Sequence, residues 1–241
     1  MRLPVMQGII RRRLLVNFRV DPAVMQAQLP SRFTPKLHDG HAIAGICLIR
    51  LEAIRPRPLP RLVGVSSENA AHRIAVFWDG SAGEQREGVF IPRRDTGSLI
   101  NHLAGGRLFP GEHHRATFAV REDRQGIDLR MQSHDRTVAV RVRGQFGGKI
   151  PSTSCFSSLE AASQFFEAGS LGYSVTRESG RLDGVELRTE GWRMEALELE
   201  DVQSSYFFDR SRFPQGSVEF DCALAMRNLS HEWRTAEDLY A

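Results

Sequence analysis

The chain has 241 residues, of which 41% are hydrophobic and 25% are charged, and its 32 Lys and Arg residues against 29 Asp and Glu residues give a net charge of +3. These values are typical of a soluble globular protein and exclude a disordered, collagen-like or membrane-spanning chain. Lys36 and Lys149 are the only lysines, so the other basic residues are all arginines. A mechanism that needs a lysine amine therefore has few residues to use.

Strands are predicted along the first half of the chain wherever apolar and polar residues alternate. They cover residues 14–20, 41–54, 73–78 and 88–91. Between the first two, Asp21 and Pro22 begin a short helix that runs to residue 29, because Asp is a favoured N-cap and Pro fits the first helical position. A second helix begins at Thr96 or Ser98 and ends near residue 103.

The second half of the chain continues the alternation. Strands are predicted over residues 115–121, 127–131, 137–143, 185–189, 192–199 and 217–224. A capping-box pattern at 157–160 leads into a third helix, which ends at Gly169. Many strands and three short helices predict a mainly β (α+β) architecture, with an antiparallel sheet curled into a barrel or a sandwich. No repeat or linker divides the chain, so we predict one domain over residues 1–241.

Cysteine usage and the N-terminal residues bear on location and partners. Cys47, Cys155 and Cys222 are far apart and form no CxxC pair, which indicates neither a disulfide framework nor a thiolate zinc site. The chain shows no signal-peptide pattern and no apolar run close to the roughly 20 residues of a membrane span. Its arginines are interspersed with acids, and no nucleic-acid motif is present. We therefore expect a cytoplasmic protein with neither a membrane nor a nucleic acid as partner.

Several familiar site motifs are absent. Residues 144–149 look like a phosphate loop, but the glycine spacing before Lys149 is wrong and Ile150 stands where the metal-binding hydroxyl should be. The sequence contains no GxGxxG, GxSxG or HExxH pattern. Nucleotide-dependent, α/β-hydrolase and zinc-protease chemistry are thus not indicated, and no cofactor is expected.

Polar residues gather in two places where strands are predicted to meet loops. Residues 66–73 lie directly before an apolar strand, and Glu68 or His72 there could serve as a general acid or base. The alternative is a structural loop in which Arg73 pairs with Glu68. Arg93 and Arg94 follow a strand, and a pair of guanidinium groups suits bidentate binding of a carboxylate or phosphate. The alternative for this pair is a solvated turn.

A third polar group precedes the strand at 115–121. His113 and His114 follow Glu112, which suggests a zinc site. In an extended segment, however, neighbouring side chains point to opposite faces, so both imidazoles cannot easily bind one ion. We expect no metal here. One imidazole would instead face the interior as an acid or base, and the other would be solvated.

Taken together, several segments resemble acetoacetate decarboxylase-like proteins, and among them most closely the branch grouped as domain of unknown function 2071. The resemblance is carried in chain order by residues 11–22, 29–30, 88–92, 106–107, 110, 116, 165–174 and 204–207. It covers about residues 8–235. The resemblance implies a single β-barrel-like domain with a pocket inside the barrel, often assembled into homo-oligomers.

The chain departs from that family where the decarboxylases carry paired lysines. One of those lysines forms a Schiff base with a β-keto acid and its neighbour lowers its pKa. His113 and His114 stand at the matching positions, and an imidazole cannot form the imine. Two other residues of the family's site have counterparts here. The resemblance matches the family's arginine before the first strand to Arg11, and it places a glutamate of the family's site near Glu68.

Two hypotheses of different class follow. In the first, the protein is an acid–base enzyme, lyase-like or hydrolase-like, acting on a small carboxylate or oxo acid without a Schiff base. Its candidate proton carriers are Glu68, His72 and His113, and its candidate substrate-binding residues are Arg11, Arg94, His114 and Tyr173. In the second, the protein is a non-catalytic module that has kept the pocket and lost the reactive amine. The enzyme hypothesis requires Glu68 or His72 to meet His113 and an arginine in one cavity.

Overall fold

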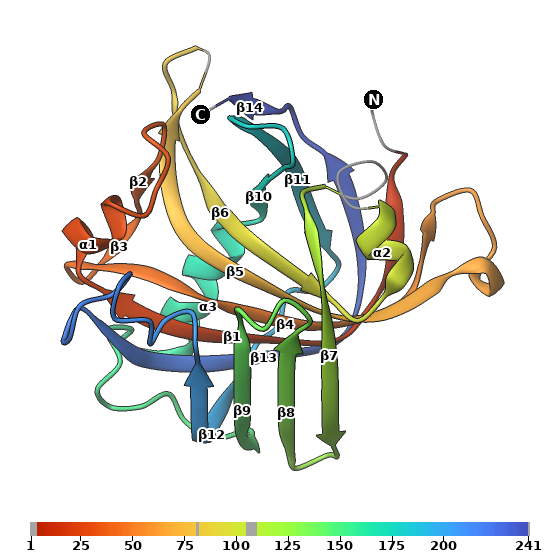
Figure 1. The fold of residues 1–241 in the computed structure, drawn as a ribbon. Coiled ribbons are helices and arrows are strands. Elements are labelled where there is room, and N and C mark those ends of the chain that lie inside the picture. Colours follow the sequence, from red (N-terminus) through yellow and green to blue (C-terminus); the bar gives the residue numbers. More distant parts are fainter. Residues whose placement is uncertain (1–3, 81, 105–109, 241) are drawn as a thin grey trace.

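Strands make up most of the computed structural model, which describes residues 4–80, 82–104 and 110–240 (Figure 1). The strands are β1 (Met6–Val20), β2 (Thr34–Pro35), β3 (Leu37–His38), β4 (His41–Pro56), β5 (Val65–Asp79), β6 (Gln85–Thr96), β7 (His113–Glu122), β8 (Gly126–Ser133), β9 (Ala139–Phe146), β10 (Leu171–Val175), β11 (Arg181–Thr189), β12 (Glu195–Ser204), β13 (Val218–Thr235) and β14 (Leu239–Tyr240). The helices are α1 (Pro22–Gln26), a 3₁₀ turn η1 (Arg61–Val63), α2 (Leu99–Ala104) and α3 (Leu159–Ala168).

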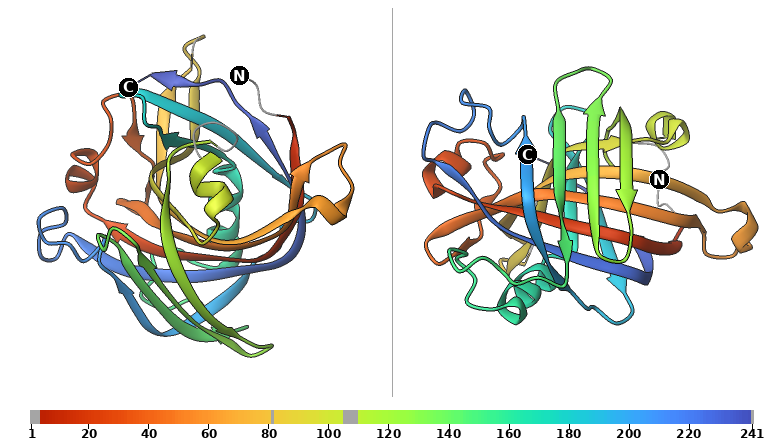
Figure 2. Two further views of the ribbon diagram at one scale, coloured as in Figure 1. Left: turned by 45° about the vertical axis from the view of Figure 1, so that its right-hand side comes forward. Right: turned by 90° about the horizontal axis from the view of Figure 1, so that it is seen from below.

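Five long strands organise the sheet. They pair antiparallel in the order β13, β1, β4, β5, β6. The free edge of β6 pairs in parallel with both β10 and β7, and the free edge of β13 pairs with both β12 and β11. The pairings therefore return to their starting strand by two routes, one through β10 and β11 and the other through β7, β8, β9 and β12. Figure 2 shows β7, β8 and β9 crossing the long strands.

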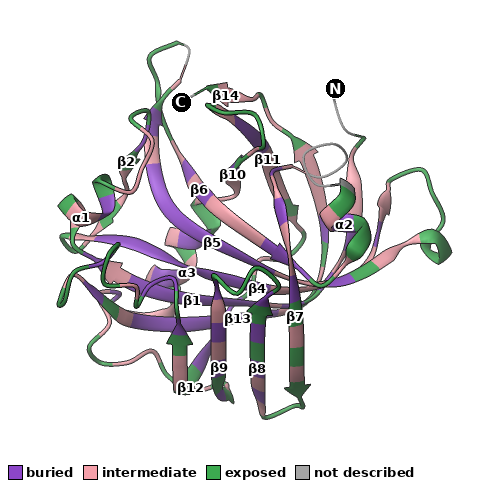
Figure 3. Cartoon of the chain, viewed as in Figure 1, coloured by how far each residue is buried: buried purple, intermediate pink, exposed green. Residues whose placement is uncertain are grey.

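Both faces of the long strands are buried, which explains the long buried stretches in Figure 3. Successive residues of a strand point to opposite faces. In β1, Leu14 and Val16 join a core completed by β8 and β9, whereas Leu15 joins a second core completed by α3. A strand with two buried faces reads as a continuous apolar run, as β4 does from Ala42 to Leu48.

The mainly β architecture and its mostly antiparallel pairing are confirmed. All ten predicted strands and all three predicted helices are present. The side chain of Asp21 caps α1 as predicted, by accepting from the backbone N–H groups of the next turn, while Ser158 caps α3. β10 was not predicted, because it has only five residues and a glycine. In the described part of the chain, every helix is too short or too polar to cross a bilayer.

The predicted loop positions of the polar clusters were wrong. Residues 66–73 lie inside β5, and residues 91–96 lie inside β6. Because neighbours in a strand face opposite ways, each cluster is divided between the two cores. Residues 106–107, which carry part of the family resemblance, lie outside the described residues.

Candidate functional site

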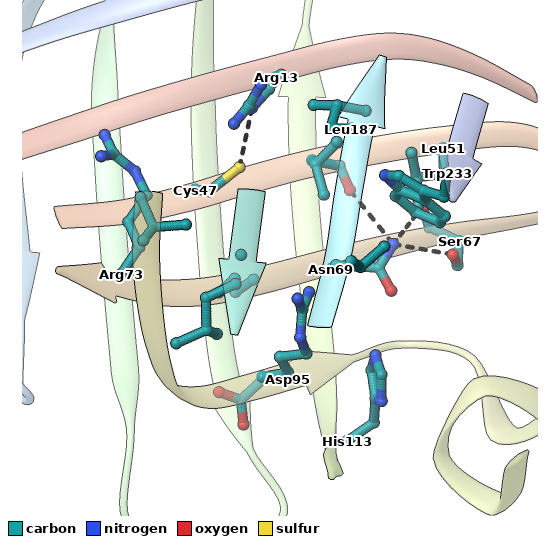
Figure 4. Close-up of a pocket in the computed structure, with 18 of the residues that line it drawn as sticks. Arg13, Cys47, Leu51, Ser67, Asn69, Arg73, Asp95, His113, Leu187 and Trp233 are labelled. Carbon is teal, nitrogen blue, oxygen red and sulfur yellow. Dashed lines mark hydrogen bonds between the residues drawn. The ribbon is translucent and has the colours of Figure 1, made fainter. Parts of the chain in front are cut away.

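A cavity of about 130 Å³ lies on the α3 side of the long strands (Figure 4). Its walls come from β1, β4, β5 and β6, with β11, α3 and the start of β7 closing it. Much of the lining is apolar. The apolar residues include Ile49, Leu51, Val89, Ile91, Phe166 and Trp233.

Three arginines line this cavity without an acidic partner. They are Arg13 of β1, Arg73 of β5 and Arg94 of β6. Among the described residues, no carboxylate oxygen lies within 4.0 Å of any of these guanidinium groups. Their sequence neighbours differ, because Arg12 bridges two glutamates at 2.5 and 2.8 Å and Arg93 pairs with Asp95 at 2.8 Å.

Neutral groups hold the three guanidinium groups in place. Arg13 Nε donates to the Sγ atom of Cys47 at 3.3 Å, and Arg94 Nε donates to the hydroxyl of Ser174 at 2.8 Å. Arg73 donates to a buried asparagine, and its guanidinium carbon lies 4.6 Å from the centre of the Phe166 ring. Burial lowers the pKa of Arg73 and that of Arg94 to about 10. Both therefore remain cationic at neutral pH.

A β-bulge aims Arg94 into the cavity. In the pairing of β5 with β6, His72 pairs with Arg93 and Ile74 with Phe90, so the single residue between these pairs on β5 faces two residues on β6. The extra residue in β6 reverses the alternation, so that Arg94 and not Arg93 shares the face of Val89 and Ile91. Simple period-two reading cannot predict this change.

His113 supplies the imidazole of the cavity. Burial, together with the charge of Arg94, lowers the pKa of His113 to about 3, so the ring is neutral. Its Nδ1 atom lies 3.2 Å from the carbonyl oxygen of Gly111. That contact assigns the proton to Nδ1 and leaves the Nε2 lone pair as an acceptor.

A small polar network forms one end of the cavity. Asn69 Nδ2 donates to Ser67 Oγ at 2.9 Å, and Asn101 Nδ2 donates to the same oxygen at 3.2 Å. The Oδ1 atom of Asn69 accepts from the hydroxyl of Thr96 at 2.8 Å. Figure 4 shows Ser67 and Asn69 on the side of the cavity away from Arg73. The neutral polar network thus lies away from Arg73, while Arg94 stands opposite Ala71, between Asn69 and Arg73 along β5. The one acidic residue of the described lining, Asp95, is paired with Arg93.

Of the seven predicted site residues, the cavity brings together only Arg94 and His113. Glu68 lies on the opposite face of β5, where it accepts from Arg12 at 2.5 Å. Burial raises the pKa of Glu68, and the charge of Arg12 partly offsets this. The required meeting of Glu68 or His72 with His113 is therefore not found.

His72 and Tyr173 belong to the core on the other side of the long strands. The His72 ring is fully buried with its centre 4.4 Å from that of Tyr206, and within the described part of the chain neither ring nitrogen has a hydrogen-bond partner. Burial lowers the pKa of His72 to about 3. Tyr173 packs against the rings of Phe33 and Trp78.

Arg11 and His114 point away from the cavity. Arg11 is exposed and donates to Asn228 Oδ1 at 2.6 Å. The Nδ1 atom of His114 lies 3.7 Å from a carboxylate oxygen of Asp135. The prediction that His113 and His114 face opposite ways is confirmed. Among the described residues, no cluster of three His, Cys, Asp or Glu side chains could hold a metal ion.

Neither lysine lines the cavity. Lys149 is exposed. Lys36 Nζ pairs with a Glu87 oxygen at 2.6 Å and faces a much smaller hollow of about 10 Å³, which shares Arg13 and Arg73 with the main cavity.

Neither Arg13 nor Cys47 was singled out from the sequence as a cavity residue, and within the polar cluster at 66–73 functional roles were assigned to Glu68 and His72 and not to Asn69 or Arg73. For Arg13 a signal was present, since it directly precedes the predicted strand at 14–20 and lies two residues before Leu15, so an earlier strand start places both on one face. For Asn69 the signal was hidden, because a polar stretch was interpreted as a loop. Arg73 was predicted as the first residue of the strand at 73–78, but only a structural role was considered for it.

Comparison with known proteins gives one family and one fold. The model of the family DUF2071, described as an uncharacterized conserved protein, matches residues 9–226. The search of curated proteins gave no match. Among solved structures, acetoacetate decarboxylase from Legionella pneumophila is similar with a TM-score of 0.62 and 11% identity, over 98% of this chain and 88% of that chain.

Two further structures share the fold at low identity. An acetoacetate decarboxylase-like enzyme from Sphingomonas wittichii RW1 has a TM-score of 0.60 and 14% identity, over 99% of this chain and 93% of that chain. The enduracididine biosynthesis enzyme MppR, complexed with pyruvate, has a TM-score of 0.58 and 12% identity, over 100% of this chain and 91% of that chain.

Proposed function

The chain belongs to the DUF2071 family and has the acetoacetate decarboxylase-like fold, and from this premise we propose that it binds a small carboxylate, such as a 2-oxo acid, in the cavity of Arg13, Arg73 and Arg94. One observation carries the proposal: three guanidinium groups share a cavity and have no acidic partner among the described residues. A buried charge is costly unless it is paired, so an anionic ligand would supply the missing partner.

The size of the cavity favours a small ligand. A cavity of about 150 Å³ accommodates benzene, and this one measures about 130 Å³. Pyruvate has six non-hydrogen atoms, as benzene does, and MppR, a protein of the same fold, is complexed with it. A guanidinium group can bind a carboxylate through two parallel hydrogen bonds, which suits a planar oxo acid. The apolar walls would then surround the carbon chain of the ligand.

His113 is the residue best placed to act on such a ligand. Burial is the main cause of the lowered pKa of His113, and the charge of Arg94 adds to it. A carboxylate held near Arg94 would offset that charge and so would make Nε2 a better proton acceptor. Glu68 and His72 lie on the other face of β5, so acid–base chemistry in the cavity would depend on His113. The alternative is that His113 has no catalytic role and that the protein is a non-catalytic binding module. Both alternatives require the same anion site.

A thermal-shift comparison of pyruvate with its neutral amide tests the proposal. Ligand binding to the folded state raises its apparent stability, and a hundredfold excess over Kd should raise Tm by about 5 °C or more. We expect pyruvate and related oxo acids to stabilise the protein and pyruvamide to have no effect. Equal shifts for the acid and the amide, or no shift with any small carboxylate, would contradict it.

A further inference from the structure

Cys47 occupies a distinctive place in the cavity. Its Sγ atom accepts a hydrogen bond from Arg13 Nε at 3.3 Å, and Figure 4 shows the thiol and Arg13 together at one wall. Cys47 lies opposite Ala71, and Ala71 lies opposite Arg94. Adjacent strands are about 4.8 Å apart, so Cys47 and Arg94 stand on either side of a residue whose side chain is a single methyl group. A small ligand held by Arg94 can therefore lie over Ala71 and reach the sulfur.

A second observation points to an anion at the same place. Arg73 is 3% exposed and lines the same cavity, yet its Nε atom has no hydrogen-bond partner among the residues that the structure describes. A buried guanidinium with an unused N–H group is a site prepared for an acceptor. The thiol thus shares its cavity with three cations, each able to hold the carboxylate of a ligand.

We propose that Cys47 is a nucleophile of this cavity, which forms a covalent bond to the electrophilic carbon of a small carboxylate held by the arginines. The inference rests on the proposed function, since the arginines must first bind the anion. With a 2-oxo acid, a bond forms between Sγ and C2 while the carbonyl π bond breaks. The thiol proton passes to the former carbonyl oxygen, giving a thiohemiketal without an oxidant or a further reactant.

The two other cysteines provide internal controls. Cys222 is fully buried, and Cys155 lies outside the cavity beside a carboxylate of Asp221. Burial, reinforced by the charge of Asp221, raises the pKa of the Cys155 thiol to about 12. A carboxylate-bearing electrophile should therefore distinguish Cys47 from both of them within one molecule.

Alkylation by iodoacetate and by iodoacetamide tests the proposal. The two reagents transfer a carbon to sulfur with loss of iodide, and the thiol proton goes to solvent, but only iodoacetate is an anion. Rates at each cysteine are followed by peptide mass spectrometry, with and without pyruvate. We expect iodoacetate to modify Cys47 at least tenfold faster than iodoacetamide does, and pyruvate to slow that reaction. Arg94→Gln should abolish the preference, whereas the exposed Arg11→Gln should keep it.

The outcomes separate this inference from the proposed function. If Cys47 reacts with neither reagent while pyruvate still raises Tm, the anion site stands and the nucleophile is refuted. If Cys47 reacts at least as fast with iodoacetamide and pyruvate neither protects it nor raises Tm, both are refuted. Cys47→Ser nearly preserves the size of the side chain and should lose the label; it should also show a smaller pyruvate-induced shift, because the arginines still bind the anion but no thiohemiketal forms.

Discussion

Arg73 donates a hydrogen bond from Nη2 to the Oδ1 atom of Asn17, so a buried guanidinium in the cavity has a neutral amide where a carboxylate would neutralise it. Asn17 is itself fully buried and uses its Nδ2 group to donate to the backbone oxygen of Leu15 at 3.2 Å. This arrangement positions Arg73 while leaving its charge available to a ligand.

Asn17→Asp should therefore weaken anion binding without changing the size of the side chain. The new carboxylate would pair with Arg73 and compete with the ligand for its charge. We expect the Kd for pyruvate, measured by isothermal titration calorimetry, to rise roughly tenfold, as expected for one charge-assisted hydrogen bond of about 1.5 kcal/mol. An unchanged Kd in a folded variant would show that Arg73 does not contribute to the site.

The buried imidazoles should make the protein acid-sensitive. The pKa of His72 is lowered from 6.5 to about 3 in the folded state, so below pH 6.5 the unfolded chain binds a proton that the folded chain does not. The neutral His72 ring makes its full contribution to the free energy of unfolding above pH 6.5, and this contribution is lost as the pH falls toward 3. The pKa values of His113 and His231 are also lowered, to about 3 and about 4, and act in the same direction.

His72→Phe should reduce this acid sensitivity. It removes two buried nitrogens that lack partners and keeps a ring against Tyr206. Urea unfolding at pH 4 to 6 should show the slope of stability against pH reduced by up to about 1.4 kcal/mol per pH unit, the equivalent of one proton. Equal slopes for both proteins would argue against a buried neutral His72.

Glu68 should matter for stability and not for binding. Glu68→Gln leaves the buried Arg12 with Glu122 as its one acidic partner at hydrogen-bond distance among the described residues. We expect the free energy of unfolding to fall by about 1 to 3 kcal/mol, while the Kd for pyruvate stays within about twofold of its original value. A large loss of pyruvate affinity with normal stability would place Glu68 at the ligand site.

Borohydride trapping should yield no covalent adduct with pyruvate or acetoacetate. Lys149 is exposed, and Lys36 is engaged with Glu87 outside the main cavity. Intact-mass measurement after reduction should give the mass of the unmodified chain. A stoichiometric adduct on Lys36 or Lys149 would restore Schiff-base chemistry to this protein.

More of the fold than of the candidate site could be predicted from the sequence. Period-two alternation identified the long strands, and Asp21 marked the start of the first helix. The prediction of the site failed where the alternation of apolar and polar residues was hidden. Residues 66–73 are mostly polar and yet lie within a strand that is buried on both faces. Their membership in β5 depends on pairing with β4 and β6, which the local sequence does not encode. The bulge that selects Arg94 over Arg93 is likewise set by tertiary pairing.

The affinity of Arg94→Gln for pyruvate, measured by calorimetry beside Arg11→Gln, tests the anion site most directly. Arg94 lines the cavity without an acidic partner within 4.0 Å among the described residues, whereas Arg11 is exposed on the same sheet and bonded to Asn228. We predict a loss of tenfold or more for Arg94→Gln and no change for Arg11→Gln. Equal affinities of the two variants, or a loss confined to Arg11→Gln, would contradict the assignment of the cavity as the anion site.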